Sequence, residues 1–162
     1  MKQKFLLSFM AIAFGVLSVS AQSEEKLIVN AGKAENITIA NDMDVVLLAG
    51  TGAGQSVSLN PEAAKSLKLN LSANSMTISP LKQTTGKERL KIFLYVNALK
   101  TITVENNSLV KTIGMIDSPK LEVYIDGEAT VHLKTNGDIK AQSLSDAEID
   151  IKYISDTRVA KH

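Results

Sequence analysis

Apolar and polar residues alternate along most of the chain after residue 22, and this pattern predicts a succession of β-strands. Residues 67–72, Leu-Lys-Leu-Asn-Leu-Ser, alternate without a break. Residues 90–96 place Leu90, Ile92, Leu94 and Val96 on one side. Side chains of a strand point alternately to its two faces, so such segments bury one face and expose the other. Shorter segments follow the same rule: residues 37–39, 57–59, 76–78, 102–104, 121–125, 131–133 and 149–151.

Two segments depart from this alternation. Residues 45–49, Val-Val-Leu-Leu-Ala, form a continuous apolar run, which predicts a strand covered on both faces. Residues 60–65 begin with Asn60 and Pro61, which suit the N-cap and the first position of a helix. The residues that follow favour helix, so we expect one short helix before the alternation resumes at Leu67.

The second half of the chain holds three similar segments, each made of a short strand, a polar turn and a second short strand. They span residues 102–110, 123–131 and 141–149, so the spacings are 123 − 102 = 21 and 141 − 123 = 18 residues. A nearly constant period of this size is typical of stacked units that share one core. The pattern favours an all-β solenoid; a meander of hairpins is the alternative.

The first 21 residues have the order of a secretory signal peptide. A basic start at residues 1–4 precedes the apolar run 5–17 and the small residues 18–21. The run is shorter than the roughly 20 residues that cross a bilayer as a helix, although an uncleaved anchor is the alternative. We predict cleavage after Ala21, a single domain over residues 22–162, and no transmembrane segment after cleavage. The destination is export, to the periplasm or to the cell surface and medium.

Composition excludes several classes of function. The chain has no cysteine, which excludes disulfides, thiolate catalysis, Cys-ligated metals and a lipid-modified cysteine. The net charge is +1 and aromatic residues make up only 4%, so a nucleic-acid partner is not expected. The apolar and charged fractions, 44% and 22%, are those of a folded globular chain.

Residues able to carry catalysis or hold a metal are sparse. The two histidines, His132 and His162, lack the partners of a catalytic triad or a zinc site. The glycine-rich segment 50–54 lacks the lysine and the following helix of a phosphate loop. We predict no cofactor, no metal and no catalytic residue. Several carboxylates could converge if turns stack, giving a calcium site or an acid/base pair for glycan cleavage, although turn chemistry alone accounts for them: Asp42, Asp44, Asp117, Asp126, Asp138, Asp146 and Asp150.

Three aromatic residues are the candidate contact surface. Phe93 and Tyr95 point opposite to Leu90, Ile92 and Leu94, and Tyr124 points opposite to its apolar neighbours. In stacked strands such side chains face outward and could align into a strip that contacts a glycan or a protein. The alternative is that they only cover the sheet beside a neighbouring strand.

The chain resembles a known family, the head GIN domain of auto-transporter adhesins, over residues 28–154. The resemblance rests on the order of four stretches: residues 37–48, 66–78, 90–104 and 121–133. It implies a right-handed β-helix-like fold, for which we expect short N-terminal strands as a cap, and it implies export and adhesion. It carries over no catalytic residue.

These observations predict an exported, non-catalytic binding module, adhesin-like or acting within the cell envelope. Its partner would be a protein or a glycan. One alternative is a structural, self-assembling envelope protein that forms a homo-oligomer through an open end of the solenoid. The other is an enzyme acting on glycan.

Overall fold

A computed structural model of the protein describes residues 26–50, 56–82, 89–145 and 150–155. The backbone alone is described for residues 150–155. Outside the described residues lie the predicted signal peptide, residues 51–54 of the glycine-rich segment, Asp146 and His162.

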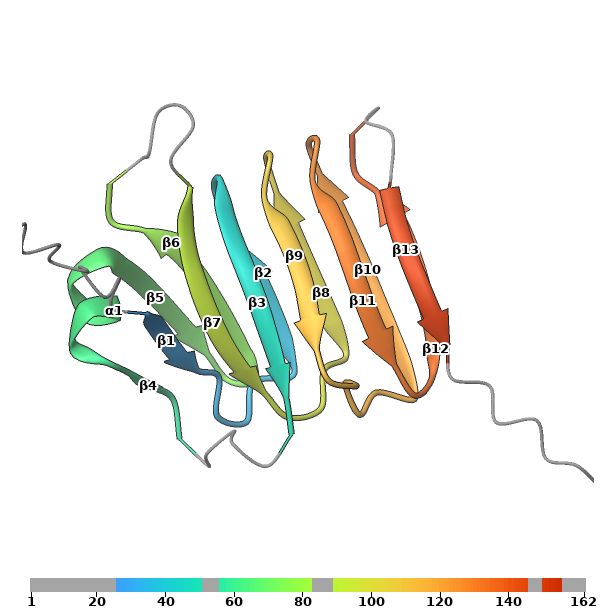
Figure 1. Ribbon diagram of the computed structural model, residues 1–162, viewed down its shortest axis with the longest axis horizontal. Helices are drawn as coiled ribbons and strands as arrows, with labels where there is room; N and C mark the ends of the chain where they lie inside the picture. The colour runs from blue at the N-terminus through green and yellow to red at the C-terminus, as the bar shows by residue number, and fades with distance from the viewer. Residues whose placement is uncertain (1–25, 51–55, 83–88, 146–149, 156–162) are drawn as a thin grey trace, which may run out of the picture.

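The fold is all-β, as predicted, and consists of two sheets that pack face to face (Figure 1). Sheet A has the strand order β13 (Asp150–Ser155), β11 (Thr130–Thr135), β9 (Leu109–Ile113), β3 (Met43–Ala49), β7 (Leu90–Val96), β1 (Leu27–Asn30) and β4 (Ser58–Leu59). Sheet B has the order β12 (Asp138–Ser143), β10 (Lys120–Asp126), β8 (Thr101–Glu105), β2 (Asn36–Ile39), β6 (Ser75–Pro80) and β5 (Leu67–Ser72). Neighbouring strands are parallel, except that β4 and β5 run antiparallel to their partners.

Five pairs of consecutive strands build both sheets, and each pair gives one strand to each. They are β2–β3, β6–β7, β8–β9, β10–β11 and β12–β13. Both sheets are mixed and neither closes on itself, so the right-handed solenoid stays a prediction.

The expectation that the short N-terminal strands form a cap is wrong for β2 and β3. The pair β2–β3 lies in the middle of the stack, between β6–β7 and β8–β9. Of the N-terminal strands, β1 lies near the end of sheet A, where it pairs with β4. A parallel partner can come from anywhere in the sequence, so the order of strands along the chain did not reveal the order in space.

The register of sheet B matches the repeat seen in the sequence. Val123 of β10 pairs with Ile102 on one side and with Ala141 on the other, at the predicted spacings of 21 and 18 residues. In sheet A, however, Val131 pairs with Ile151 rather than with Ile149. The register of β13 is therefore shifted by two residues relative to the repeat, and Ile149 itself lies outside the described residues.

The core lies between the sheets and consists of the inward side chains of nearly every strand. Ile92, Leu94 and Val96 of β7 are fully buried, as the alternation predicted. In β3, Val45, Val46 and Leu47 are all buried, so the strand is covered on both faces at Val46.

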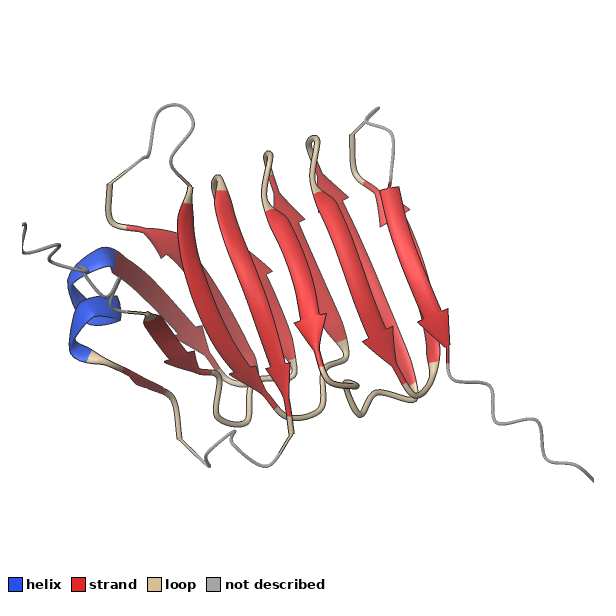
Figure 2. Cartoon of the chain, in the orientation of Figure 1, coloured by secondary structure: helices blue, strands red, loops and turns tan. Residues whose placement is uncertain are grey.

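The predicted helix is present as α1 (Pro61–Ser66), and Figure 2 shows it at one end of the two sheets. Asn60 is its N-cap: its side-chain oxygen accepts the backbone N–H of Ala63 at 3.1 Å. The same oxygen accepts the N–H of Ile28 at 3.0 Å, and the Asn60 amide donates to the carbonyl of Lys26 at 2.7 Å. One side chain therefore starts the helix and ties it to β1.

Candidate contact surface

Phe93 and Tyr95 lie on the outer face of sheet A. They alternate along β7 with the buried residues Ile92, Leu94 and Val96, and both are half-buried. The outward direction predicted from the sequence is therefore correct for both rings.

Neighbouring strands extend this face with apolar side chains. Phe93 pairs with Ile28 of β1 and Val46 of β3, and Tyr95 pairs with Leu48 of β3. Leu48 pairs in turn with Ile113 of β9, whose side chain is 56% exposed. Tyr95, Leu48 and Ile113 thus form an apolar row across three adjacent strands, and sequence reasoning found only its first member. The sequence feature that points to the other two members is an apolar residue, Leu48 or Ile113, at an outward position of its strand.

Two lysines cover the ring of Phe93. The ammonium nitrogens of Lys26 and Lys91 lie 5.3 Å and 5.8 Å from the ring centroid, within the range of cation–π attraction. A ligand would have to displace these groups to stack on Phe93. The apolar row is therefore the more accessible part of the face.

Tyr124 does not join this surface. It lies on the outer face of sheet B, because β10 belongs to that sheet and its neighbours Val123 and Ile125 point into the core. The three predicted residues therefore occupy opposite sides of the molecule and form no single strip. Alternation along a strand tells inside from outside, but it does not tell which sheet the strand joins.

The Tyr124 hydroxyl has a partner of its own. It donates a hydrogen bond to the Glu122 carboxylate at 3.0 Å. This hydrogen bond, together with the negative charge of Glu122, raises the pKa of Tyr124 above its ordinary value.

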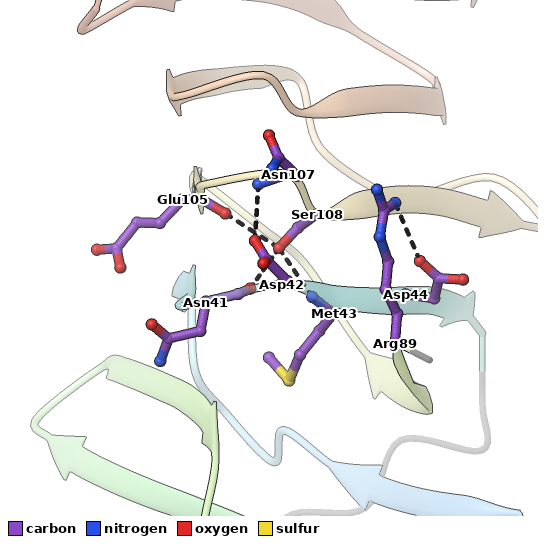
Figure 3. A network of polar contacts seen from close by, with 8 residues as sticks. All are labelled: Asn41, Asp42, Met43, Asp44, Arg89, Glu105, Asn107 and Ser108. Carbon is purple, nitrogen blue, oxygen red and sulfur yellow. Dashed lines mark hydrogen bonds and ion pairs between the residues drawn. The ribbon is translucent and has the colours of Figure 1, made fainter. Parts of the chain in front are cut away.

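The carboxylates Asp42 and Asp44 are held apart by separate partners (Figure 3). Asp42 lies in the turn before β3 and accepts the backbone N–H of Asn107 at 3.0 Å. Asp44 points outward from β3, with its Oδ1 atom 3.6 Å from Arg89 Nη1. That distance suits an ion pair but is too long for a hydrogen bond, and Oδ1 has no hydrogen-bond partner among the described residues.

A buried serine links two of the turns that connect sheet B to sheet A through hydrogen bonds. Ser108 lies in the turn between β8 and β9 and is 1% exposed. Its hydroxyl accepts the N–H of Met43 at 3.1 Å and lies 2.5 Å and 3.0 Å from the carbonyl oxygens of Asn41 and Glu105 (Figure 3). The hydrogen bonds of Asp42 and Ser108 therefore join the pair β2–β3 to the pair β8–β9.

Comparison with known families finds a match over residues 33–153, to the family described as "Putative auto-transporter adhesin, head GIN domain". The match covers most of the chain. The protein belongs to the head GIN domain family. No curated protein and no solved structure matches it significantly.

In the described part of this GIN domain, no group of three or more histidine and carboxylate side chains lies close enough to hold a metal ion. Asp117 accepts a hydrogen bond from the Asn136 amide at 2.7 Å. His132 is half-buried on the outer face of sheet A, where it pairs with Lys111. No helix within the described ranges is long and apolar enough to cross a membrane.

The GIN domain also has a groove that the sequence did not reveal. It has a volume of about 520 Å³ and lies at the edge where the β7–β8 and β9–β10 turns meet, between residues 98–100 and 117–120. Its lysines are already paired: Lys100 lies 2.7 Å from Glu35, and Lys120 lies 3.7 Å from Glu122. The groove is therefore close to charge balance and offers no convergent reactive groups.

Proposed function

We propose that this GIN-domain protein is an exported, non-catalytic binding module of the adhesin kind, and that it contacts its partner through the outer face of sheet A. The observation that carries the proposal is the apolar row Tyr95, Leu48 and Ile113. Ile113 is exposed and Tyr95 and Leu48 are partly exposed, and apolar side chains that reach the surface in register across adjacent strands are typical of interaction surfaces. The family supports an adhesin-like role and export, and the signal-peptide pattern of residues 1–21 supports export independently.

The absence of catalysis is also part of the proposal. Two of the candidate carboxylates have structural partners: Asp42 accepts the Asn107 backbone N–H, and Asp117 accepts the Asn136 amide. We further take the stacked strand pairs to form a solenoid, which the register of β8, β10 and β12 supports.

Binding to a panel of glycans and matrix proteins tests this function. The test compares the purified protein, produced from the full chain, with the double variant Tyr95→Ser/Ile113→Ser. The matched control is Tyr124→Ser/Leu71→Ser, which removes one tyrosine and one exposed leucine away from the outer face of sheet A. We expect the first variant to lose most of the binding and the control to keep it. Unchanged binding by the first variant, at an unchanged melting temperature, would contradict the assignment of this face.

The open end of the two sheets favours a second candidate, self-assembly with another copy of the chain. Strands β12 and β13 are the last strands at this end among the described residues, whereas α1, β4 and β5 occupy the other end. Ala141 and Leu144 are exposed there, Leu144 by 55%. An edge strand with unpaired N–H and C=O groups can add a further strand.

Light scattering over a concentration series tests assembly. The candidate predicts a defined oligomer that Leu144→Lys dissociates and Leu81→Lys does not, since Leu81 is equally exposed but lies elsewhere. A monomer at every concentration would exclude it.

A further inference from the structure

The two outer faces of the molecule differ in charge. Among the side chains described for the strands of sheet A, three lysines point outward, Lys91, Lys111 and Lys134, against one carboxylate, Asp44. Asp44 lies beside Arg89, so its charge is already balanced. The strands of sheet B carry outward residues of both signs: Lys68, Lys120, Lys140, Glu105, Glu122, Asp126 and Asp138.

The lysines on sheet A have no carboxylate partner within the described residues. The ion pairs found there involve Lys65, Arg89, Lys100 and Lys120, and none involves Lys91, Lys111 or Lys134. All three lysines are exposed. Three positive charges that form no ion pair among the described residues attract a negatively charged partner over a distance of about 10 Å at ordinary ionic strength.

Lys111 and Lys134 border the apolar row, and Lys91 lies beside Phe93 on the same face. Lys91 of β7 pairs with Asp44 of β3, and Asp44 pairs in turn with Leu109 of β9. Lys111 lies two residues beyond Leu109 on β9. Lys134 lies two residues beyond His132, the partner of Lys111. With strands about 4.8 Å apart and about 3.3 Å per residue, the Cα atoms of adjacent lysines stand roughly 8–12 Å apart along a diagonal. This spacing suits a chain of charges better than a single small anion.

The shape of this face favours a polysaccharide over a membrane. Val46 is buried, Leu48, Phe93 and Tyr95 are only partly exposed, and Ile113 is the one exposed apolar side chain of the row, so this patch offers few apolar side chains for insertion into a bilayer. A flat apolar row beside ammonium groups can instead contact the apolar faces of sugar rings while the lysines pair with carboxylates.

We infer that the outer face of sheet A binds a linear acidic polysaccharide, with sugar rings on Tyr95, Leu48 and Ile113 and acidic groups on Lys91, Lys111 and Lys134. This inference rests on the proposed function, because it names the ligand class of the same face.

The test measures binding of the full-chain protein to immobilised polygalacturonate, with neutral dextran and anionic phosphatidylglycerol vesicles as separate arms. The variant Lys91→Gln/Lys111→Gln/Lys134→Gln removes the charges on sheet A. The control Lys68→Gln/Lys120→Gln/Lys140→Gln removes the same number from sheet B. Each exposed charge contact is worth about a factor of two to five, so the first variant should bind polygalacturonate at least about tenfold more weakly. The control should bind like the wild-type protein, and raising NaCl from about 0.02 M to about 0.5 M should weaken wild-type binding strongly.

Several results would overturn the inference. They are an absence of binding to polygalacturonate, equal binding to dextran, equal loss in both triple variants, or binding confined to the vesicles. If Tyr95→Ser/Ile113→Ser still abolishes binding to a neutral glycan or a matrix protein, the proposed function stands and only the acidic ligand is wrong. If that variant binds normally everywhere, the proposed function fails with it.

Discussion

The hydroxyl of Ser108 accepts the backbone N–H of Met43, a residue 65 positions earlier in the chain, at a distance of 3.1 Å. Ser108 is buried in the turn between β8 and β9, and Met43 begins β3. A single serine thus joins two strand pairs that are neighbours in space and distant in sequence.

Ser108→Ala should therefore lower the free energy of unfolding by about 1–3 kcal/mol. The substitution leaves the buried Met43 N–H and the partly buried Asn41 carbonyl without this partner, and unsatisfied buried polar groups cost about that much. Urea denaturation measures the change. Ser58→Ala, at an exposed position of β4, is the control and should stay within about 0.5 kcal/mol of the wild-type protein. Equal stabilities of the two variants would show that the turn tolerates loss of the hydroxyl.

Gly127→Ala should destabilise the fold by about 2 kcal/mol or more. Gly127 has a φ of 111°, and a Cβ atom added there would lie 2.8 Å from the Cα of Asn106 in the neighbouring turn. Gly50→Ala is a matched control, because Gly50 has a φ of 133° but open space around the added Cβ. Both substitutions strain the backbone, so the difference in melting temperature between the two variants reports mainly the steric contact, and no difference would argue against close stacking of the turns.

Leu94→Ala should cost about 2–5 kcal/mol of unfolding free energy. Leu94 is fully buried at the middle of β7, so truncation removes core contacts and leaves a cavity. Leu71→Ala removes the same atoms from a side chain that is 57% exposed and should cost much less. Denaturant titration of both variants checks the predicted difference, which a similar loss in both would contradict.

Glu122→Gln should lower the pKa of Tyr124 toward its ordinary value of 10.0. The hydrogen bond to Glu122 and the Glu122 charge both favour the neutral hydroxyl in the folded protein, and both weaken when the carboxylate becomes an amide. Since the folded pKa is raised, the stabilising contribution is fully present below the pKa of the unfolded state. It is lost as the pH rises through the folded value. Nuclear magnetic resonance titration of the Tyr124 ring gives the pKa directly. Glu128→Gln, an exposed turn position, serves as the control, and an unchanged pKa in Glu122→Gln would rule out the interaction as the cause.

Local sequence patterns predicted much of this structure. The alternation around Phe93 and Tyr95 correctly placed both rings outward, and Asn60 correctly marked the start of the helix. The repeat spacing predicted the pairing of Val123 with Ile102 and Ala141. It did not predict the register of the last pair, where Val131 pairs with Ile151, because the spacing of segments does not say how many residues each turn takes.

The sequence predicted only part of the candidate contact surface. Leu48 and Ile113 lie 65 residues apart in the sequence, and Lys111 and Lys134 lie on different strands. No pattern within one segment indicates that these residues share one face of the molecule. No such pattern indicates that Tyr124 and Phe93 lie on different sheets.

The sequence by itself determined most of the strands, the inward and outward sides of those that alternate, and the family. These properties depend on the two-residue period of an extended backbone and on the order of local segments, both of which act over short stretches. Only the tertiary structure decided that β2–β3 lies between β6–β7 and β8–β9, and that Phe93 and Tyr124 face opposite ways. Those outcomes depend on which strands share hydrogen bonds across long separations. That choice is made by the packing of the whole core and not by any one segment.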